Sequence, residues 1–449
     1  MHNEIDLADL ADSLIFFAKQ NGAEEVEIYG QSGEEFDVTV RDTKIESLSR
    51  NKTRGIGLRV FSNQRMAFSH SSDWNLETLK SLTLHTIDAA KYSGQDEYNG
   101  LPELSAINSI DLELFDHQII QIPDAELIKN AFELESIAKN FDSKIKQIEG
   151  SSFSSFIGYS FIANNKGLFA KSESTTISAS VQSVATDGTE NQVAGWYDVS
   201  RKLNELESIE FIGKKASQRA LDRLFAKKIK TGKYPVLFDP STASSFFSGL
   251  FPAFSGEMIN KGASFLHDDL SRPIAPEFLT LIDNPHILSG LGAKTVDGEG
   301  NPTKTIPIIK NGILTNFLYD TYQAKKADRL STGNASRNFK STPSVGFHTL
   351  LVQPGNRSID EMIKDIQHGI LITGTIGFGV DTVAGNYSKG AHGWFIENGR
   401  LSFPIHEFTI ADSIKNMLKN IVEIGNDARK HGTSLAPSIL FSEMTIAGS

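Results

Sequence analysis

The sequence of 449 residues contains no cysteine. This absence excludes disulfides, thiolate nucleophiles and every metal site that needs a cysteine ligand. No stretch approaches the roughly 20 apolar residues that a membrane-spanning helix requires, so we expect no membrane span. The acidic segment 1–12 also lacks the basic and then apolar pattern of a signal peptide. We therefore predict a cytoplasmic protein that does not contact the membrane.

Positive charge is also in short supply. The formal net charge is -11, and an acidic chain repels a phosphate backbone, so we expect no nucleic-acid partner. One local exception is a series of basic residues spaced by four, which would form one stripe on a helix: Lys215, Arg219, Arg223 and Lys227. A solvated helix face is the favoured interpretation of this stripe, and a phosphate-binding surface is the alternative.

Two kinds of sequence pattern divide the chain. Before about residue 231, segments with the helical spacing of apolar residues alternate with segments of strand-like alternation. After Tyr234, glycines and short apolar runs dominate, as in a sheet-rich domain. The basic segment 227–233 marks the predicted boundary of an α+β fold, with an N-terminal α+β domain over 1–231 and a sheet-rich C-terminal domain over 232–449. Helices are expected near residues 7–21, 76–91, 123–141, 209–224 and 413–424.

Two Asn-Gly pairs predict tight β-hairpins. Asn311-Gly312 and Asn398-Gly399 each lie between apolar runs, and Asn-Gly tolerates the positive φ that both turn positions need. In the second hairpin, a regular two-residue loop would pair Trp394 with Phe403. That register predicts a core face carrying Trp394, Ile396, Leu401, Phe403 and Ile405.

Residue patterns that carry chemistry are scarce. No two of the eleven histidines are three or four residues apart, so the helical zinc motif of metallopeptidases is absent. The hairpin register places His392 opposite Ile405, so His406 should project from the opposite face of the sheet. His392 and Glu407 then form a diagonal pair on one face and are the candidate catalytic residues. A hydrogen-bonded structural histidine is the favoured interpretation of His392.

Two glycine-rich segments resemble binding loops only superficially. Gly374–Gly379 reverses the spacing of a dinucleotide-binding loop, and we interpret it as a turn where backbones pack closely. Asp297–Asn301 resembles a calcium loop in composition, but it lacks the full ligand pattern and the closing glutamate. We expect this segment to lead into the Asn311-Gly312 hairpin.

Several blocks of sequence carry a resemblance to a known family. They are Arg54–Val60, Asn311–Leu314, Tyr319–Lys326, Ser331–Ala335, Gly385–Gly390, Trp394–Gly399, Gly425–Asp427 and Glu443–Gly448. In this order they resemble the TldD/PmbA family, and within it the PmbA branch, which is also called TldE and modulator of DNA gyrase. The resemblance implies cytoplasmic peptide processing by paired TldD and PmbA subunits. It also implies a curved, mostly antiparallel sheet in the C-terminal domain.

The same resemblance points to a metal site that this chain lacks. In the TldD branch, a His-Glu-x-x-x-His helix and a later cysteine hold zinc. Alignment on the block Gly262–Phe265 places Phe247 and Phe251 near the positions of the two histidines and Ser248 near that of the glutamate. The resemblance therefore implies no cofactor in this chain and zinc in a TldD-like partner. We interpret the aromatic stripe around Phe247 as core packing, with a subunit interface as the alternative.

Three functions from different classes are compatible with these residues. The favoured hypothesis is a PmbA-like subunit of a metalloprotease system, which pairs with a TldD-like paralogue and binds an extended peptide at a sheet edge. The alternative is a homodimeric peptide-binding or scaffold protein without catalysis. The third hypothesis is a hydrolase with an unrecognised site that includes His392 and Glu407.

Overall fold

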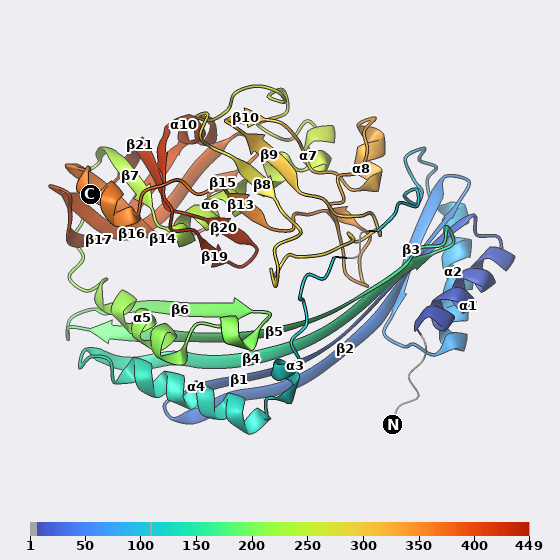
Figure 1. Ribbon diagram of the computed structural model, residues 1–449, viewed down its shortest axis with the longest axis horizontal. Helices are drawn as coiled ribbons and strands as arrows, with labels where there is room; N and C mark the ends of the chain where they lie inside the picture. Colours follow the sequence, from blue (N-terminus) through green and yellow to red (C-terminus); the bar gives the residue numbers. More distant parts are fainter. Residues whose placement is uncertain (1–6, 108–109, 449) are drawn as a thin grey trace.

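The molecule consists of a long curved sheet and a sheet-rich C-terminal part that lies above it in Figure 1. The computed structural model describes residues 7–107 and 110–448. Helices and antiparallel strands occur together in the chain, so the predicted α+β class is confirmed. None of the helices in these two ranges is long and apolar enough to cross a membrane.

Six antiparallel strands form the N-terminal sheet, in the order β3-β2-β1-β4-β5-β6. Its four central strands are 17 to 20 residues long, and the twist of such strands bends the sheet along its length. The predicted alternation is confirmed at Phe36, Val38 and Val40 of β1, whereas all residues from 55 to 61 of β2 are buried, Leu58 and Val60 among them. The strands are β1 (Glu25–Arg41), β2 (Lys44–Ser62), β3 (Arg65–Ser71), β4 (Ile145–Asn164), β5 (Phe169–Thr186) and β6 (Asn191–Ser200).

Two pairs of helices pack against opposite ends of this sheet (Figure 1). Leu14 of α1 and Leu79 of α2 belong to one hydrophobic core. Leu134 of α4 and Ile212 of α5 belong to a second core. These four helices match the predicted ones. The helices are α1 (Leu7–Gln20), α2 (Leu76–Tyr92), α3 (His117–Gln121), α4 (Asp124–Lys139) and α5 (Ile209–Leu221), with a short 3-10 helix at Leu203–Glu205.

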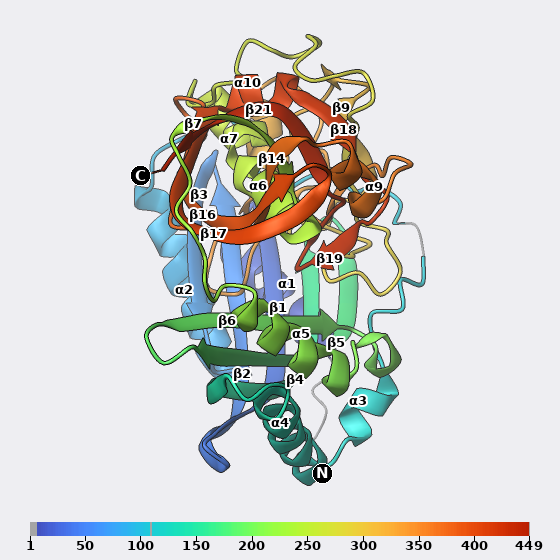
Figure 2. The same ribbon diagram turned by 90° about the vertical axis from the view of Figure 1, so that its left-hand side faces the viewer.

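The C-terminal part contains a small closed barrel. β14 pairs with β7 on one side and with β16 on the other, so the ladder β14-β7-β21-β17-β16 returns to its first strand. Figure 2 shows this ring of strands nearly end-on. All of its pairings except β14–β7 are antiparallel, as predicted. The strands are β7 (Gly232–Phe238), β14 (His368–Ile376), β16 (Asn386–Glu397), β17 (Arg400–Ser413) and β21 (Ile439–Ala447), with β15 (Val380–Asp381) and β18 (Ile421–Ile424) attached.

A second C-terminal sheet and several short helices complete the fold. The sheet has the order β10-β9-β8-β13-β20-β19. Its strands are β8 (Leu281–Asp283), β9 (Ile306–Lys310), β10 (Ile313–Leu314), β13 (Leu350–Val352), β19 (Arg429–His431) and β20 (Ser434–Ala436), and a separate pair is β11 (Ala335–Ser336) with β12 (Ser344–Val345). The helices are α6 (Pro240–Phe254), α7 (Gly256–Asn260), α8 (Thr321–Lys326), α9 (Ile359–Lys364) and α10 (Ile414–Lys419). The domain boundary at 231/232 stays a prediction, although β7 begins at Gly232.

Both Asn-Gly hairpins are confirmed. Asn311 and Gly312 have φ values of 49° and 77°, and they connect β9 to β10. Asn398 and Gly399 have φ values of 50° and 72°, and they connect β16 to β17. Positive φ at both central positions is the geometry for which this residue pair is suited.

The predicted register of the β16–β17 hairpin is wrong beyond its first two pairs. Trp394 lies opposite Pro404 instead of Phe403, and Ile405 lies opposite Gly393. Each shift is a β-bulge, which adds a residue to one strand, bends it and helps a sheet to close. Of the predicted core face, Ile396 and Ile405 are buried, Trp394 and Phe403 are partly buried, and Leu401 is exposed.

The helix after this hairpin is shorter than predicted. α10 begins at a cap on Ser413, whose Oγ accepts a hydrogen bond from the Asn416 N–H at 3.2 Å. The helix ends at Lys419 and does not continue to residue 424, because Ile421 begins β18 and pairs with Phe441 of β21. Strand pairing in the core therefore overrides the local helical spacing.

Candidate functional site

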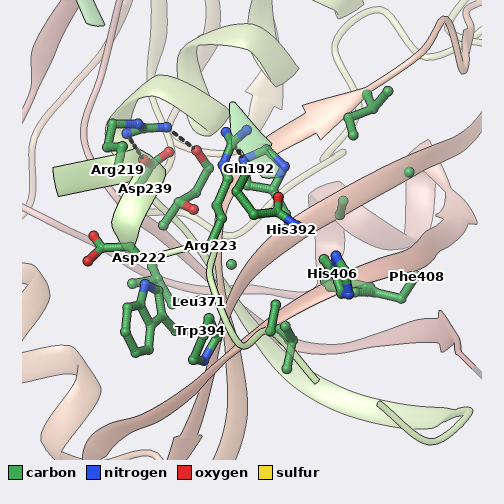
Figure 3. Close-up of a pocket in the computed structure, with 18 of the residues that line it drawn as sticks. Gln192, Arg219, Asp222, Arg223, Asp239, Leu371, His392, Trp394, His406 and Phe408 are labelled. Carbon is green, nitrogen blue, oxygen red and sulfur yellow. Dashed lines mark hydrogen bonds and ion pairs between the residues drawn. The ribbon is translucent and has the colours of Figure 1, made fainter. Parts of the chain in front are cut away.

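A cavity of about 490 Å³ opens where the N-terminal sheet meets the barrel. α5 and β6 form one wall, and strands β14, β16 and β17 form the other (Figure 3). Trp196 comes from the first wall, and Leu371 and Trp394 come from the second. The volume lies within the roughly 300–1,000 Å³ that is typical of ligand pockets, and such pockets favour domain interfaces.

Three of the four basic residues in the predicted stripe line this cavity: Lys215, Arg219 and Arg223. The interpretation as a solvated helix face is wrong for Arg219, whose side chain is only 18% exposed. Lys227 is separated from the stripe because α5 ends at Leu221, and its ammonium lies 4.6 Å from the centre of the Phe403 ring. The residues spaced by four thus place positive charges along the cavity between the N-terminal sheet and the barrel.

Arg223 holds a charge that no acidic side chain balances directly. Its guanidinium donates to the Val193 carbonyl oxygen and, at 2.7 Å, to Nε2 of His392. Across residues 7–107 and 110–448, no carboxylate oxygen lies within 4.0 Å of it. Burial lowers the pKa of Arg223 to about 10, and the neighbouring charge of Arg219 acts in the same direction.

Arg219, in contrast, has partners on the barrel. Its guanidinium donates to the Thr373 carbonyl oxygen at 2.6 Å and lies 3.9 Å from Oδ2 of Asp239. The other oxygen of Asp239 accepts the Thr242 N–H at 2.7 Å and caps α6. Figure 3 shows Arg219 beside Asp239 and Arg223 beside His392.

His392 is buried and held neutral. Burial, together with repulsion from Arg223 and Arg219, lowers the pKa of His392 to about 3. Because Nε2 accepts from Arg223, the hydrogen-bond network assigns the ring proton to Nδ1. A Cβ at Gly374 would lie 2.5 Å from the imidazole, so glycine leaves the space for this ring. The favoured interpretation of His392 as a hydrogen-bonded histidine agrees with this geometry.

The other predicted residues of the hairpin lie differently from expectation. His392 and His406 both line the cavity, and the regular register from which opposite faces were predicted is interrupted beside them. The interruption is the bulge between Ala391 and Gly393. Glu407 also lines the cavity, but its side chain is 64% exposed and its carboxylate lies 3.9 Å from Nζ of Lys228. His392 is thus bonded to Arg223, and Glu407 lies near Lys228. The catalytic role of these two residues stays a prediction.

Trp196 on β6 is a functional candidate that sequence reasoning missed. The guanidinium of Arg429 lies 3.7 Å from the indole centre, that of Arg219 lies at 5.2 Å, and the ammonium of Lys215 lies at 5.5 Å. Its Nε1 donates to Glu207 at 2.8 Å, which fixes the ring. An aromatic face surrounded by cations is stabilising, and it keeps these charges at the cavity wall.

The residues that the predicted alignment places at the metal helix of the TldD branch lie on α6. Phe247 is 1% exposed and belongs to the main C-terminal core, while Phe251 is partly buried and its ring lies 4.9 Å from that of Phe347. The Ser248 hydroxyl lies 2.5 Å from that of Ser434. Core packing is therefore the role of this aromatic stripe, and the interface alternative is wrong for Phe247.

A zinc ion does not fit these side chains. Zinc needs imidazole, thiolate or carboxylate ligands, and phenylalanine has no donor atom. A search of the described ranges also finds no group of three or more histidine, aspartate or glutamate side chains that could hold a metal ion. The arrangement at the cavity can instead offer hydrogen-bond donors, fixed positive charge and aromatic walls to a ligand.

Comparison with known families covers most of the chain. Residues 26–90, 118–224 and 231–448 match the models of domain 1, the central domain and the C-terminal domain of the PmbA/TldA metallopeptidases. A protein of Buchnera aphidicola subsp. Acyrthosiphon pisum, named metalloprotease PmbA homolog, is 33% identical over 449 residues, which are 100% of this chain and 98% of the relative. A relative from the same strain, named metalloprotease TldD homolog, is 23% identical over 94% of this chain and 92% of its own.

Solved structures show the same architecture. The crystal structure of a protein from Bacteroides thetaiotaomicron, named as a candidate modulator of DNA gyrase, superimposes with a TM-score of 0.91. It is 27% identical in sequence and covers 98% of this chain and 99% of its own. The long curved sheet and the closed barrel are thus shared with a protein whose structure was determined by experiment.

Proposed function

This chain belongs to the PmbA/TldA metallopeptidase family, and on that premise we propose that it is the metal-free subunit of a cytoplasmic two-component peptidase. Its part in the complex is to hold an extended peptide. A TldD-like partner supplies the zinc, which polarises the peptide carbonyl and activates water.

The observation that carries this proposal is the composition of α6. A catalytic zinc site needs three protein ligands and an open position for water. In the predicted alignment, Phe247 and Phe251 stand near the ligand positions, and both side chains pack in the apolar core. Ser248 stands near the position of the catalytic glutamate, and its hydroxyl is engaged by Ser434. The helix thus supports a role in structure and leaves bond cleavage to another chain.

The relatives support a system of two chains. The same Buchnera strain has both a PmbA homolog and a TldD homolog, and each matches more than nine tenths of this chain. Two full-length paralogues in one organism are what a two-component enzyme requires.

The cavity supports a peptide as the ligand. Gln192 and Trp196 on β6 line it, and β6 is the outermost strand of the N-terminal sheet in the described part of the chain. An extended peptide can pair with an edge strand through its main chain while a neighbouring pocket receives one of its side chains or ends. Backbone pairing of this kind would tolerate many peptide sequences.

Elemental analysis and a cleavage assay test the proposal together. The purified chain, its TldD-like paralogue and an equimolar mixture are each measured for bound zinc, for association by sedimentation, and for cleavage of an unstructured peptide. We expect no stoichiometric zinc in the isolated chain, zinc in the mixed complex, and cleavage only when both chains are present.

Two outcomes would contradict the proposal in different ways. Stoichiometric zinc in the isolated chain, together with cleavage, would make it an autonomous metallopeptidase. Complete cleavage by the paralogue alone, with a homodimer of this chain that never associates with it, would favour the alternative of a homodimeric peptide-binding or scaffold protein.

A further inference from the structure

We propose that the cavity between α5 and the barrel binds the C-terminal carboxylate of the peptide, and that Arg223 is the cationic group that recognises it. This inference rests on the proposed function, because it assumes a peptide ligand. It adds which end of the peptide the chain holds and which residue holds it.

The first argument is the missing counter-charge of Arg223. Arg223 is partly buried, and a partly buried cation without an anion nearby leaves part of its desolvation cost uncompensated. The two hydrogen-bond partners of Arg223 are both neutral, a carbonyl oxygen of Val193 and the imidazole of His392. A carboxylate from a ligand would supply the absent negative charge in a region where water screens it poorly.

The second argument is that the acidic residues around the cavity are already engaged. Asp239 caps α6, and both oxygens of Asp427 accept from Ser438, at 2.9 and 2.7 Å. Asp222 accepts from the side-chain amide of Gln218 at 2.7 Å, and burial raises its pKa. Glu407, the fourth acidic residue of the lining, is 64% exposed and lies 3.9 Å from Nζ of Lys228. In the described ranges, none of these four carboxylates lies within 4.0 Å of the Arg223 guanidinium, so none of them neutralises its charge.

The third argument is the donor set on the same wall. His392 is a positioning residue, because its Nε2 orients the Arg223 guanidinium while Gly374 leaves space for the ring. Lys215 is exposed at the cavity and adds a second positive charge. A guanidinium with an ammonium group nearby is a suitable receptor for a carboxylate.

The remaining walls suit the last side chain of a peptide. Leu371, Ile376, Trp394 and Pro404 give the cavity an apolar side opposite the charged one. Pockets of this kind bind through apolar contact and are oriented by a few polar groups. A polyanion such as a nucleic acid is disfavoured because the chain carries a net charge of -11, whereas a single carboxylate is repelled far less.

Fluorescence anisotropy with matched peptides tests this inference. The probe is a short peptide without aspartate or glutamate, labelled at its N-terminus and prepared both as the free acid and as the C-terminal amide. We expect the full-length chain to bind the acid roughly 10- to 100-fold more tightly than the amide, as for a charge-assisted hydrogen bond.

Variants of the chain assign this preference to Arg223. Arg223→Met should bind acid and amide alike, while the control Arg272→Met removes the same charge from an exposed position and should keep the preference. His392→Gln retains an oxygen that can accept from Arg223 and should keep most of the preference. His392→Leu should lose it.

Each other result would overturn the inference in a recognisable way. Equal affinity for acid and amide would overturn it and leave peptide binding by the subunit intact. Recovery of tight binding by an amide peptide with one internal glutamate would reassign the cavity to side-chain carboxylates. If neither peptide bound, the inference would fall, and the subunit role would be judged separately by association with the paralogue and by the zinc content of the mixture.

Discussion

Arginine joins the N-terminal part to the C-terminal part at several places, and two of these contacts are built in opposite ways. In the closed contact, Arg59 of β2 lies 2.9 Å from Glu27 and 3.0 Å from Glu299, and Arg337 also pairs with Glu27. In the open contact, Arg223 faces the neutral ring of His392 beside a cavity. The same side chain is neutralised in one contact and left without an anion in the other.

The difference shows what each contact is for. All four side chains of the closed contact are at most 7% exposed, and their two positive and two negative charges balance. Glu299 also accepts the Thr321 N–H at 2.8 Å, which ties the contact to α8. A balanced and buried cluster holds two parts of a fold in one arrangement, whereas an unbalanced charge next to a cavity is ready for a ligand.

The largest expected effect comes from breaking the closed contact. Arg59→Met leaves Glu27 and Glu299 buried with reduced compensation, so we expect the free energy of unfolding to fall by about 3–5 kcal/mol. Urea unfolding monitored by circular dichroism measures the loss. Arg272→Met, which removes the same charge from the surface, should change it by less than about 0.5 kcal/mol.

A double variant separates the buried charge from simple loss of packing. Arg59→Met combined with Glu299→Gln removes one charge of each sign and should recover part of the lost stability. If Arg59→Met alone costs less than about 1 kcal/mol, the closed contact does not stabilise the arrangement of the two parts.

Asp320, which lies beside the closed contact, should give the next largest effect. Burial, together with the charge of Glu299, raises the pKa of Asp320 to about 7. Between the ordinary value of 3.8 and about 7, the folded protein holds a proton that the unfolded chain has released, so stability falls as pH rises through this window. Asp320→Asn should remove this fall and stabilise the protein at pH 8 by roughly 1–3 kcal/mol.

The Asn side chain allows a clean test at this position. Asn can still accept the Gln323 N–H and cap α8, so the substitution changes the charge and keeps the cap. Urea unfolding from pH 4 to pH 8 should show a flatter profile than the wild type. Asp268→Asn, at an exposed position, is the control, and a profile unchanged by Asp320→Asn would contradict the prediction.

Arg223→Met should change stability far less than Arg59→Met. The folded protein already disfavours the charge of Arg223, as the lowered pKa shows. An apolar side chain of similar length removes that cost while it loses two hydrogen bonds to neutral acceptors. We expect a free energy of unfolding within about 1 kcal/mol of the wild type, or slightly above it. A loss as large as that of Arg59→Met would make the open contact a structural one.

Local sequence patterns predicted the elements of this fold better than their positions in space. The Asn-Gly hairpins and the helices α1, α2, α4 and α5 follow from turn chemistry and from apolar spacing within a few residues. The bulges near Ala391 and Phe403 could not be predicted in this way, because they belong to the closure of a barrel by strands from distant segments. The early end of α10 has the same origin.

The open contact shows both the reach and the limit of sequence reasoning. The spacing by four predicts that Arg219 and Arg223 lie on one basic stripe, and His392 is a candidate residue from the sequence alone. Arg223 and His392 are 169 positions apart, and no local pattern connects them. For the closed contact the separation is greater, since Arg59 and Glu299 are 240 positions apart. The tertiary fold therefore determines which groups lie next to each arginine. Those partners determine whether the arginine holds the fold together, as Arg59 does, or faces a cavity, as Arg223 does.

The smallest expected effect belongs to Glu407, which lies at the rim of the open contact. Its carboxylate is 64% exposed and only 3.9 Å from Lys228, and exposed pairs contribute little to stability. Glu407→Gln should leave the free energy of unfolding within about 0.5 kcal/mol of the wild type. It should also preserve the preference for the acid peptide and the cleavage rate of the complex. A large loss of cleavage without a change in peptide affinity would instead place Glu407 among the catalytic residues and revive the hydrolase hypothesis.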